Sequence, residues 1–241
     1  MKTPIYLNPN IETVVVSGGG SATTTLIGWL ARYRSTNHYG DRDGLKHTPL
    51  PPIPRSRGSR AIYVLGDPVH AVLSLCRRGY QYKQSQKLTR CFPWARKLPR
   101  DWGAYEIAAS GLDFFAFHEH YLNWRMRFRT LDTLFVRSDC LFDSADSIID
   151  FLGLPPHAVE DFPRRTATET SVNEQDAYLV ASLRRTYSEF SSRIAELPSA
   201  EVVPASSLTS RYLLSPIYFA TVGRQVASRW LPRVRGVVSG C

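Results

Sequence analysis

Residues 12–25 read Glu-Thr-Val-Val-Val-Ser-Gly-Gly-Gly-Ser-Ala-Thr-Thr-Thr, and they determine how the chain is expected to fold. The β-branched run Glu12–Ser17 predicts a short buried strand, which the three following glycines end. Apolar residues then recur every three or four positions between Ser21 and Arg34, which predicts a helix. A strand, a glycine turn and a helix in this order begin a βαβ unit.

The alternation of strands and helices continues along the chain. Further strands are predicted at Ala61–Leu65 and Leu131–Val136, and helices at Val69–Arg78 and Asp143–Leu152. Another helix is predicted by aromatic residues at helical spacing: Phe114, Phe117, Tyr121, Trp124 and Phe128. This order predicts an α/β fold, a three-layer sandwich around a central, mostly parallel sheet. In such sheets ligands bind beyond the carboxyl ends of the strands.

The remaining segments carry weaker signals. Residues 37–60 are rich in Pro, Gly and Arg and predict a long surface excursion, and residues 80–103 predict a lid or an irregular insertion. Residues 171–174 form a capping box that should open a helix carrying Val180, Leu183, Tyr187, Phe190 and Ile194. We expect a single domain over residues 1–241, with its core at about 10–196 and a linker and docking helix over 197–241.

Composition limits the classes of partner and compartment. The 241 residues carry a net charge of +9, which favours an anionic partner, but the arginines are dispersed and nucleic acid is not favoured. The four cysteines have neither disulfide-framework nor metal-ligand spacing. The first residues lack the apolar stretch of a signal peptide, and no run is long enough to span a bilayer. A cytoplasmic protein with no metal and no transmembrane segment is expected.

The glycine turn and helix start predict a phosphate-binding loop. Backbone N–H groups and a helix N-terminus attract phosphate, and nearby hydroxyls can donate to it. The candidate residues are Gly18, Gly19, Gly20, Ser21, Ala22, Thr23, Thr24 and Thr25. A glycine turn with Ser and Thr as helix caps remains the simpler alternative. A nucleoside-triphosphatase loop is disfavoured because the Walker lysine is missing.

This loop resembles the 5′-phosphosulfate loop of sulfotransferases, which use 3′-phosphoadenosine 5′-phosphosulfate (PAPS). The family pattern is a Pro, a Lys or Arg, then Ser-Gly-Thr-Thr and an apolar residue, where this chain has Gly19–Leu26 as Gly-Gly-Ser-Ala-Thr-Thr-Thr-Leu. Ile62–Ser74 resembles the 3′-phosphate element of that family, with Ser74 at the position of the phosphate-binding Ser. Leu45–Pro51 resembles the Lys-Thr-His segment that supplies a catalytic base.

Two later segments extend the resemblance to about residues 10–160. Phe117–Trp124 resembles a family helix ending in Trp, and Phe135–Leu141 with Ile148–Pro155 resembles a strand, an acidic turn and a helix end reading FLGLP. The resemblance implies a P-loop-like sulfotransferase fold. It also implies PAPS as co-substrate, with a small-molecule or carbohydrate acceptor.

The resemblance assigns roles and exposes departures. It implies His47 as the base and Lys46 as the group that stabilises the sulfuryl oxygens, although a loop histidine and a solvated lysine remain alternatives. Ser74 would bind the 3′-phosphate unless it is an ordinary helix residue. Gly20 and Gly66 stand where the family has basic residues. Basic side chains that could replace these charges from other segments are Lys46, Arg57, Arg60, Arg77 and Arg78.

Three function classes follow. The first is a PAPS-dependent sulfotransferase acting on a hydroxyl or amine. The second is a catalytically impaired sulfotransferase-like protein that binds a nucleotide or an anionic partner. The third, a basic module for nucleic acid or acidic polysaccharide, rests on the net charge alone. A metal site at His118, Glu119 and His120 is disfavoured because consecutive helix residues do not share a face, so a solvated face is expected there.

Overall fold

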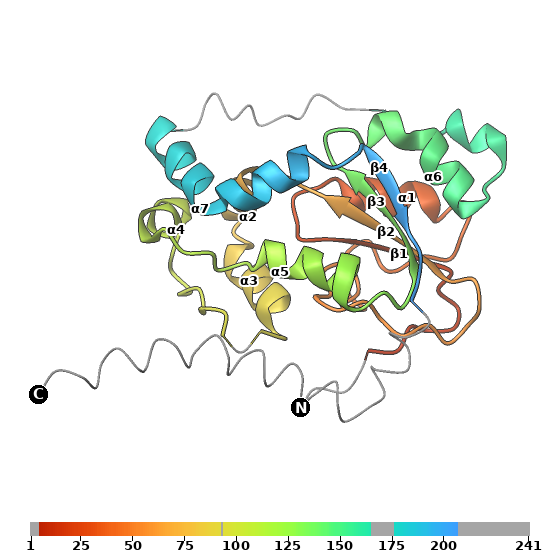
Figure 1. Cartoon of the computed structure of the whole chain (residues 1–241), viewed down its shortest axis with the longest axis horizontal. Helices are drawn as coiled ribbons and strands as arrows, with labels where there is room; N and C mark the ends of the chain where they lie inside the picture. The colour runs from red at the N-terminus through yellow and green to blue at the C-terminus, as the bar shows by residue number, and fades with distance from the viewer. Residues whose placement is uncertain (1–4, 93, 165–175, 207–241) are drawn as a thin grey trace, which may run out of the picture.

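A single sheet joins strands that lie between Thr13 and Val203 in the computed structural model, which describes residues 5–92, 94–164 and 176–206 (Figure 1). Among these residues the strand order is β1-β2-β3-β4, with β1 parallel to β2, β2 parallel to β3, and β4 antiparallel to β3. The strands are β1 (Thr13–Ser17), β2 (Arg60–Leu65), β3 (Asp132–Arg137) and β4 (Ala200–Val203). The prediction of an α/β fold with a mostly parallel sheet is confirmed.

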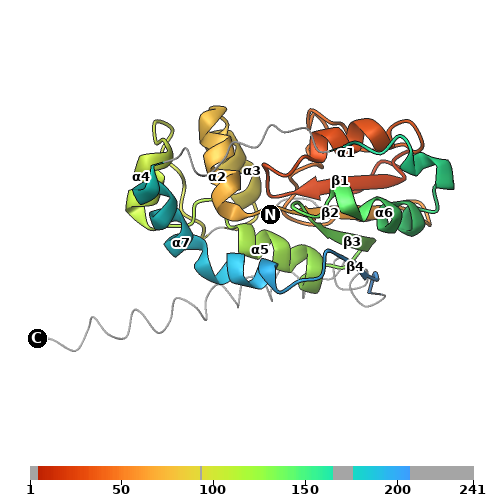
Figure 2. The ribbon, with the colours of Figure 1, turned by 90° about the horizontal axis from the view of Figure 1, so that it is seen from above.

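Seven α-helices of the described residues lie between the strands. They are α1 (Thr23–Leu30), α2 (Pro68–Arg77), α3 (Gln81–Thr89), α4 (Ala104–Ser110), α5 (Phe117–Leu122), α6 (Ala145–Leu152) and α7 (Ala177–Ala195). A π-helical turn, η1 (Asn123–Arg127), continues α5, and short 3₁₀ turns lie at Phe142–Ser144 and Pro156–Val159. Figures 1 and 2 show α2, α3, α4 and α7 grouped at one end of the molecule, and α1 and α6 beside the strands at the other.

Both faces of the sheet are covered, as the unbroken apolar strands require. Val15 and Ile62 belong to a buried cluster with the apolar residues of α1 and α6. Their neighbours Val14, Val16 and Tyr63 belong to the cluster on the opposite face, which includes residues of α2, α5 and α7. Successive side chains of a strand point to opposite faces of the sheet, so each strand packs against helices on both faces. This packing fixes the positions of the helices relative to the carboxyl ends of β1 and β2.

Two expectations about the chain outside the βα units are wrong. The linker expected from residue 197 contains β4, whose four residues are too few to show a strand period. Residues 80–103 were expected to be a lid or an irregular insertion, and the irregular conformation is wrong for residues 81–89, which form α3. The inward residues of α3 include Gln84 and Ser85 and so gave no apolar period.

Other helices differ from expectation in their ends. The aromatic helix begins at Phe117 and changes to a π turn at Asn123, so Phe114 precedes it. Asp176 caps α7 by accepting from the backbone N–H groups of Tyr178 and Leu179. The capping box at 171–174 and the docking helix expected after residue 211 lie outside the described residues.

Gly18 is required because of a close contact between the loop and α5. A Cβ atom at Gly18 would lie 2.8 Å from Cδ1 of Phe117, which is 4% exposed and cannot move away freely. Gly28 in α1 has no atom within 4 Å of a Cβ position.

We therefore predict opposite effects of two Gly→Ala substitutions. Gly18→Ala should destabilise the protein by about 1–3 kcal/mol through overpacking against Phe117. Gly28→Ala should stabilise it by about 0.5–1 kcal/mol, because Ala restricts the unfolded chain and favours the helix. Urea unfolding of both variants measures the difference. An equal or reversed effect would contradict the packing of Phe117 on Gly18.

Candidate functional site

A cavity of about 580 Å³ opens beyond the carboxyl end of β1. It is lined by Gly19–Thr24 of the glycine loop and by residues of α2, α3 and the segment 39–47. Lys46, His47 and Ser74 line it together with this loop, although they are far apart in the sequence. Of the predicted site residues, Gly18 and Thr25 do not line it.

The loop conformation explains both the glycines and a strained alanine. Gly20 has φ +68°, and a Cβ there would also lie 3.0 Å from Cα of Ala71 in α2. Ala22, the residue before α1, has φ +54°, which is uncommon for a residue other than Gly, Asn or Asp. The hydroxyl of Thr24 lies at the start of α1, where backbone N–H groups lack helical partners.

Lys46 brings a positive charge to this loop from a distant segment. Its Nζ donates to Oγ1 of Thr24 at 2.6 Å and to the carbonyl oxygen of Tyr39 at 2.9 Å. Burial lowers the pKa of this ammonium group, and the carboxylate of Asp41 partly opposes the shift. A side chain at Gly20 would be strained by its positive φ and by the contact of its Cβ with Ala71, and Lys46 brings a charge to the loop from another segment.

His47 has a defined tautomer. Its Nδ1 lies 2.9 Å from the carbonyl oxygen of Ser17, so Nδ1 carries the hydrogen and donates it. Nε2 therefore keeps its lone pair. Burial lowers the pKa of His47 to about 4, although the hydrogen bond to Ser17 and the charge of Asp41 act in the opposite direction. The imidazole is thus neutral at pH 7 and able to accept a proton.

The segment after His47 is anchored, and the expectation of a surface excursion is wrong for this part. Trp124 Nε1 donates to the carbonyl oxygen of Thr48 at 3.0 Å, and Asn123 Nδ2 donates to that of Pro49 at 3.1 Å. Both donors belong to the π turn η1. Thr130 Oγ1 donates to the carbonyl oxygen of Pro52 at 2.8 Å. These long-range bonds fix His47 and could not be read from local sequence.

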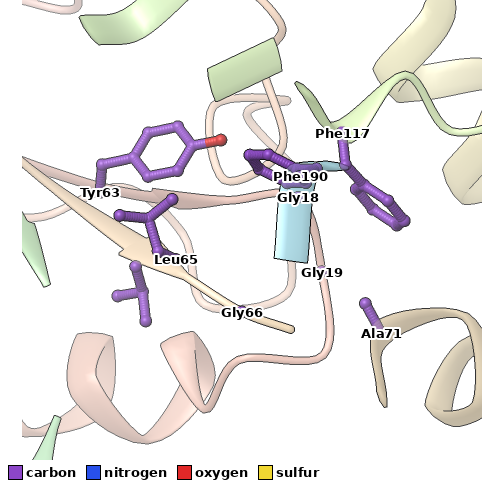
Figure 3. A pocket seen from close by; sticks show the side chains of 9 residues that line it. Gly18, Gly19, Tyr63, Leu65, Gly66, Ala71, Phe117 and Phe190 are labelled. Atoms are coloured by element: carbon purple, nitrogen blue, oxygen red, sulfur yellow. The ribbon is translucent and has the colours of Figure 1, made fainter. Parts of the chain in front are cut away.

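His120 also departs from expectation, because it is fully buried and not on a solvated face. The hydroxyl oxygen of Tyr63 lies 2.7 Å from Nδ1 of His120. Burial lowers the pKa of His120 to about 3. Tyr63 also lines a separate cavity of about 10 Å³ beneath Gly18, walled by the rings of Phe117 and Phe190 (Figure 3). That volume holds about one water molecule, so this second cavity is a packing gap.

Three cationic residues of the large cavity were not assigned to the site from sequence: Arg78, Lys83 and Lys87. Arg78 was considered as a compensating charge, whereas the lysines lie on α3, which the sequence did not predict. With Lys46 they give the cavity four cations against the single carboxylate of Asp41. Arg57, Arg60 and Arg77, also considered, do not line it.

Among the described residues no helix combines the length and apolarity needed to cross a membrane, and no group of three His, Cys, Asp or Glu could hold a metal ion. No protein-family model matches the chain, and a comparison with curated proteins finds no significant match.

We predict that His47 stays neutral well below pH 6.5. Because its folded pKa of about 4 lies below the ordinary 6.5, the unfolded chain binds more protons between these values. Stability should therefore decline as pH falls from 6.5 toward 4, and less steeply in His47→Gln. NMR titration, assigned with that variant, should show Nδ1–H and no protonation above pH 5. A midpoint near 6.5 would contradict the buried geometry.

Proposed function

We propose that this chain is a sulfotransferase with a P-loop-like fold, which transfers the sulfuryl group of PAPS to a hydroxyl or amine. The observation that carries the proposal is the convergence of three separate segments on one cavity. The loop at 19–24, Ser74 on α2, and Lys46 with His47 each resemble a different motif of that family, and all line the same space. The four cations and single carboxylate that line this cavity suit anionic ligands.

The two ends of the nucleotide find different partners. The backbone of the glycine loop, the Thr24 hydroxyl and Lys46 would hold the 5′-phosphosulfate. Ser74 would hold the 3′-phosphate with Arg78, which lies one turn further along the chain and whose Nε donates to the Ser74 carbonyl oxygen at 3.0 Å. In this proposal Arg78 takes over the role of the basic residue that the family has at the position of Gly66.

The loop conformation gives a further argument. The family pattern has Gly at the position of Ala22, and Ala22 has a φ of +54°, in the left-handed region that favours Gly. The chain keeps this conformation at a cost, although its residue is less suited to it. Strain of this kind persists where the surrounding structure requires the conformation, as at binding sites.

His47 and Lys46 divide the chemistry between them. His47 Nε2 would accept the acceptor's proton while the acceptor oxygen or nitrogen forms a bond to sulfur. The bond between sulfur and the phosphate oxygen breaks, and adenosine 3′,5′-bisphosphate leaves. Lys46 would offset the charge that develops on that oxygen. An anionic ligand beside His47 would raise its pKa from about 4 toward the range of an effective base.

A non-catalytic nucleotide-binding protein is the second candidate. It is favoured by the geometry at Gly20, because the positive φ and the contact with Ala71 disfavour the loop cation that the family uses. In the sulfotransferase, Lys46 would replace the missing loop cation both in binding the nucleotide and in the transfer reaction. In the non-catalytic protein, Lys46 would replace it only in binding.

Substitution of Lys46 separates them. With PAPS and a panel of phenol, sugar and amine acceptors, we expect the wild type to release the bisphosphate. Lys46→Gln should reduce the rate at least a hundredfold, because it removes the charge beside the leaving oxygen. Arg57→Gln, an exposed cation outside the cavity, should leave the rate within twofold.

Melting temperatures of both variants control for unfolding. Tight bisphosphate binding with no release by the wild type on any acceptor would favour the non-catalytic candidate. Release that is insensitive to Lys46→Gln would contradict the role of Lys46.

A further inference from the structure

Helix α3 presents two lysines to the cavity. Lys83 and Lys87 are four residues apart, so they lie on one face of the helix, and both line the cavity. Gln84, next to Lys83 and 6% exposed, donates from Nε2 to the carbonyl oxygen of Gly18 at 2.9 Å. This bond ties α3 to the glycine loop and holds the two lysines opposite the loop and its helix.

The charges on α3 exceed what the proposed nucleotide site uses. Lys46 is committed to Thr24, and Arg78 adjoins Ser74. Lys83 has no ion-pair or hydrogen-bond partner among residues 5–92, 94–164 and 176–206. Lys87 forms an ion pair with Asp41, in which its Nζ lies 2.5 Å from Oδ2 of the carboxylate.

Asp41 places Lys87 close to the proposed base. Its second oxygen, Oδ1, accepts from the backbone N–H of Lys46 at 2.9 Å, one residue before His47. Tyr39, on the same segment and 58% exposed, also lines the cavity and offers a flat aromatic surface. The proposed base His47, the two lysines of α3 and the exposed ring of Tyr39 therefore line the same cavity.

We propose that α3 forms the acceptor subsite, and that the acceptor is an acidic saccharide whose carboxylate or sulfate binds Lys83 and Lys87. The inference rests on the proposed function and specifies its acceptor. The anionic group would fix the sugar so that a hydroxyl lies at Nε2 of His47, while the ring packs on Tyr39. The side chain of Asp41 is 5% exposed and that of Lys87 is 44% exposed, so Lys87 can keep its pair with Asp41 and donate from another N–H of its ammonium group to the acceptor's anion.

Calorimetric titration of a chondroitin tetrasaccharide tests the proposal, with adenosine 3′,5′-bisphosphate already saturating the protein. The double variant Lys83→Gln, Lys87→Gln should bind the tetrasaccharide at least tenfold more weakly, with bisphosphate affinity changed less than threefold. Lys97→Gln, an exposed lysine outside the cavity, should change neither. Uncharged chitotetraose should bind the wild type and the double variant equally weakly.

The same titrations distinguish failure of the acceptor subsite from failure of the proposed function. An unchanged tetrasaccharide affinity in the double variant would overturn the subsite. An equal loss of tetrasaccharide and bisphosphate affinity would also overturn it, because the lysines would then belong to the nucleotide site. A wild type that binds the tetrasaccharide through both lysines in the absence of bisphosphate binding would overturn the proposed function and leave α3 as an anion site.

Discussion

The site depends on how Ser17, the last residue of β1, is bonded to the segment 46–47. Its N–H donates to the carbonyl oxygen of Lys46 at 3.0 Å, and its carbonyl oxygen accepts from Nδ1 of His47 at 2.9 Å. One strand end therefore fixes the glycine loop, a buried cation and the tautomer of a histidine. Without this pair, Lys46 would not reach Thr24 and Nε2 of His47 would have no defined direction.

Much of the fold could be predicted because the βα units have strong local patterns. Three valines before three glycines specify β1 and its loop, and Asp67 before Pro68 gives α2 a cap that accepts from the His70 N–H at 2.9 Å. Helix α3 could not be predicted, because its inward side includes Gln84, whose partner is a backbone carbonyl in the loop. Local periodicity detects apolar burial and does not detect such polar contacts.

The sequence predicted those residues of the candidate site that belong to a recognisable motif, and it did not predict the others. The loop, Ser74, Lys46 and His47 were proposed from ordered resemblances, and the structure brings them to one cavity. Lys83 and Lys87 belong to no such motif, and they line the cavity only because α3 packs beside the glycine loop. Two departures at Gly20 and Gly66 look like losses in the sequence. In three dimensions Lys46 and Arg78 line the same cavity as Gly20, whereas Gly66 does not line it.

Binding of the nucleotide product tests the central claim most directly. Calorimetric titration of the wild-type chain with adenosine 3′,5′-bisphosphate, with ATP and adenosine 5′-monophosphate as comparisons, measures whether the cavity recognises both phosphate positions. We expect micromolar or tighter binding of the bisphosphate and at least tenfold weaker binding of each comparison nucleotide, a difference of about 1.4 kcal/mol. Equal affinity for all three, or no heat of binding at millimolar bisphosphate, would contradict it.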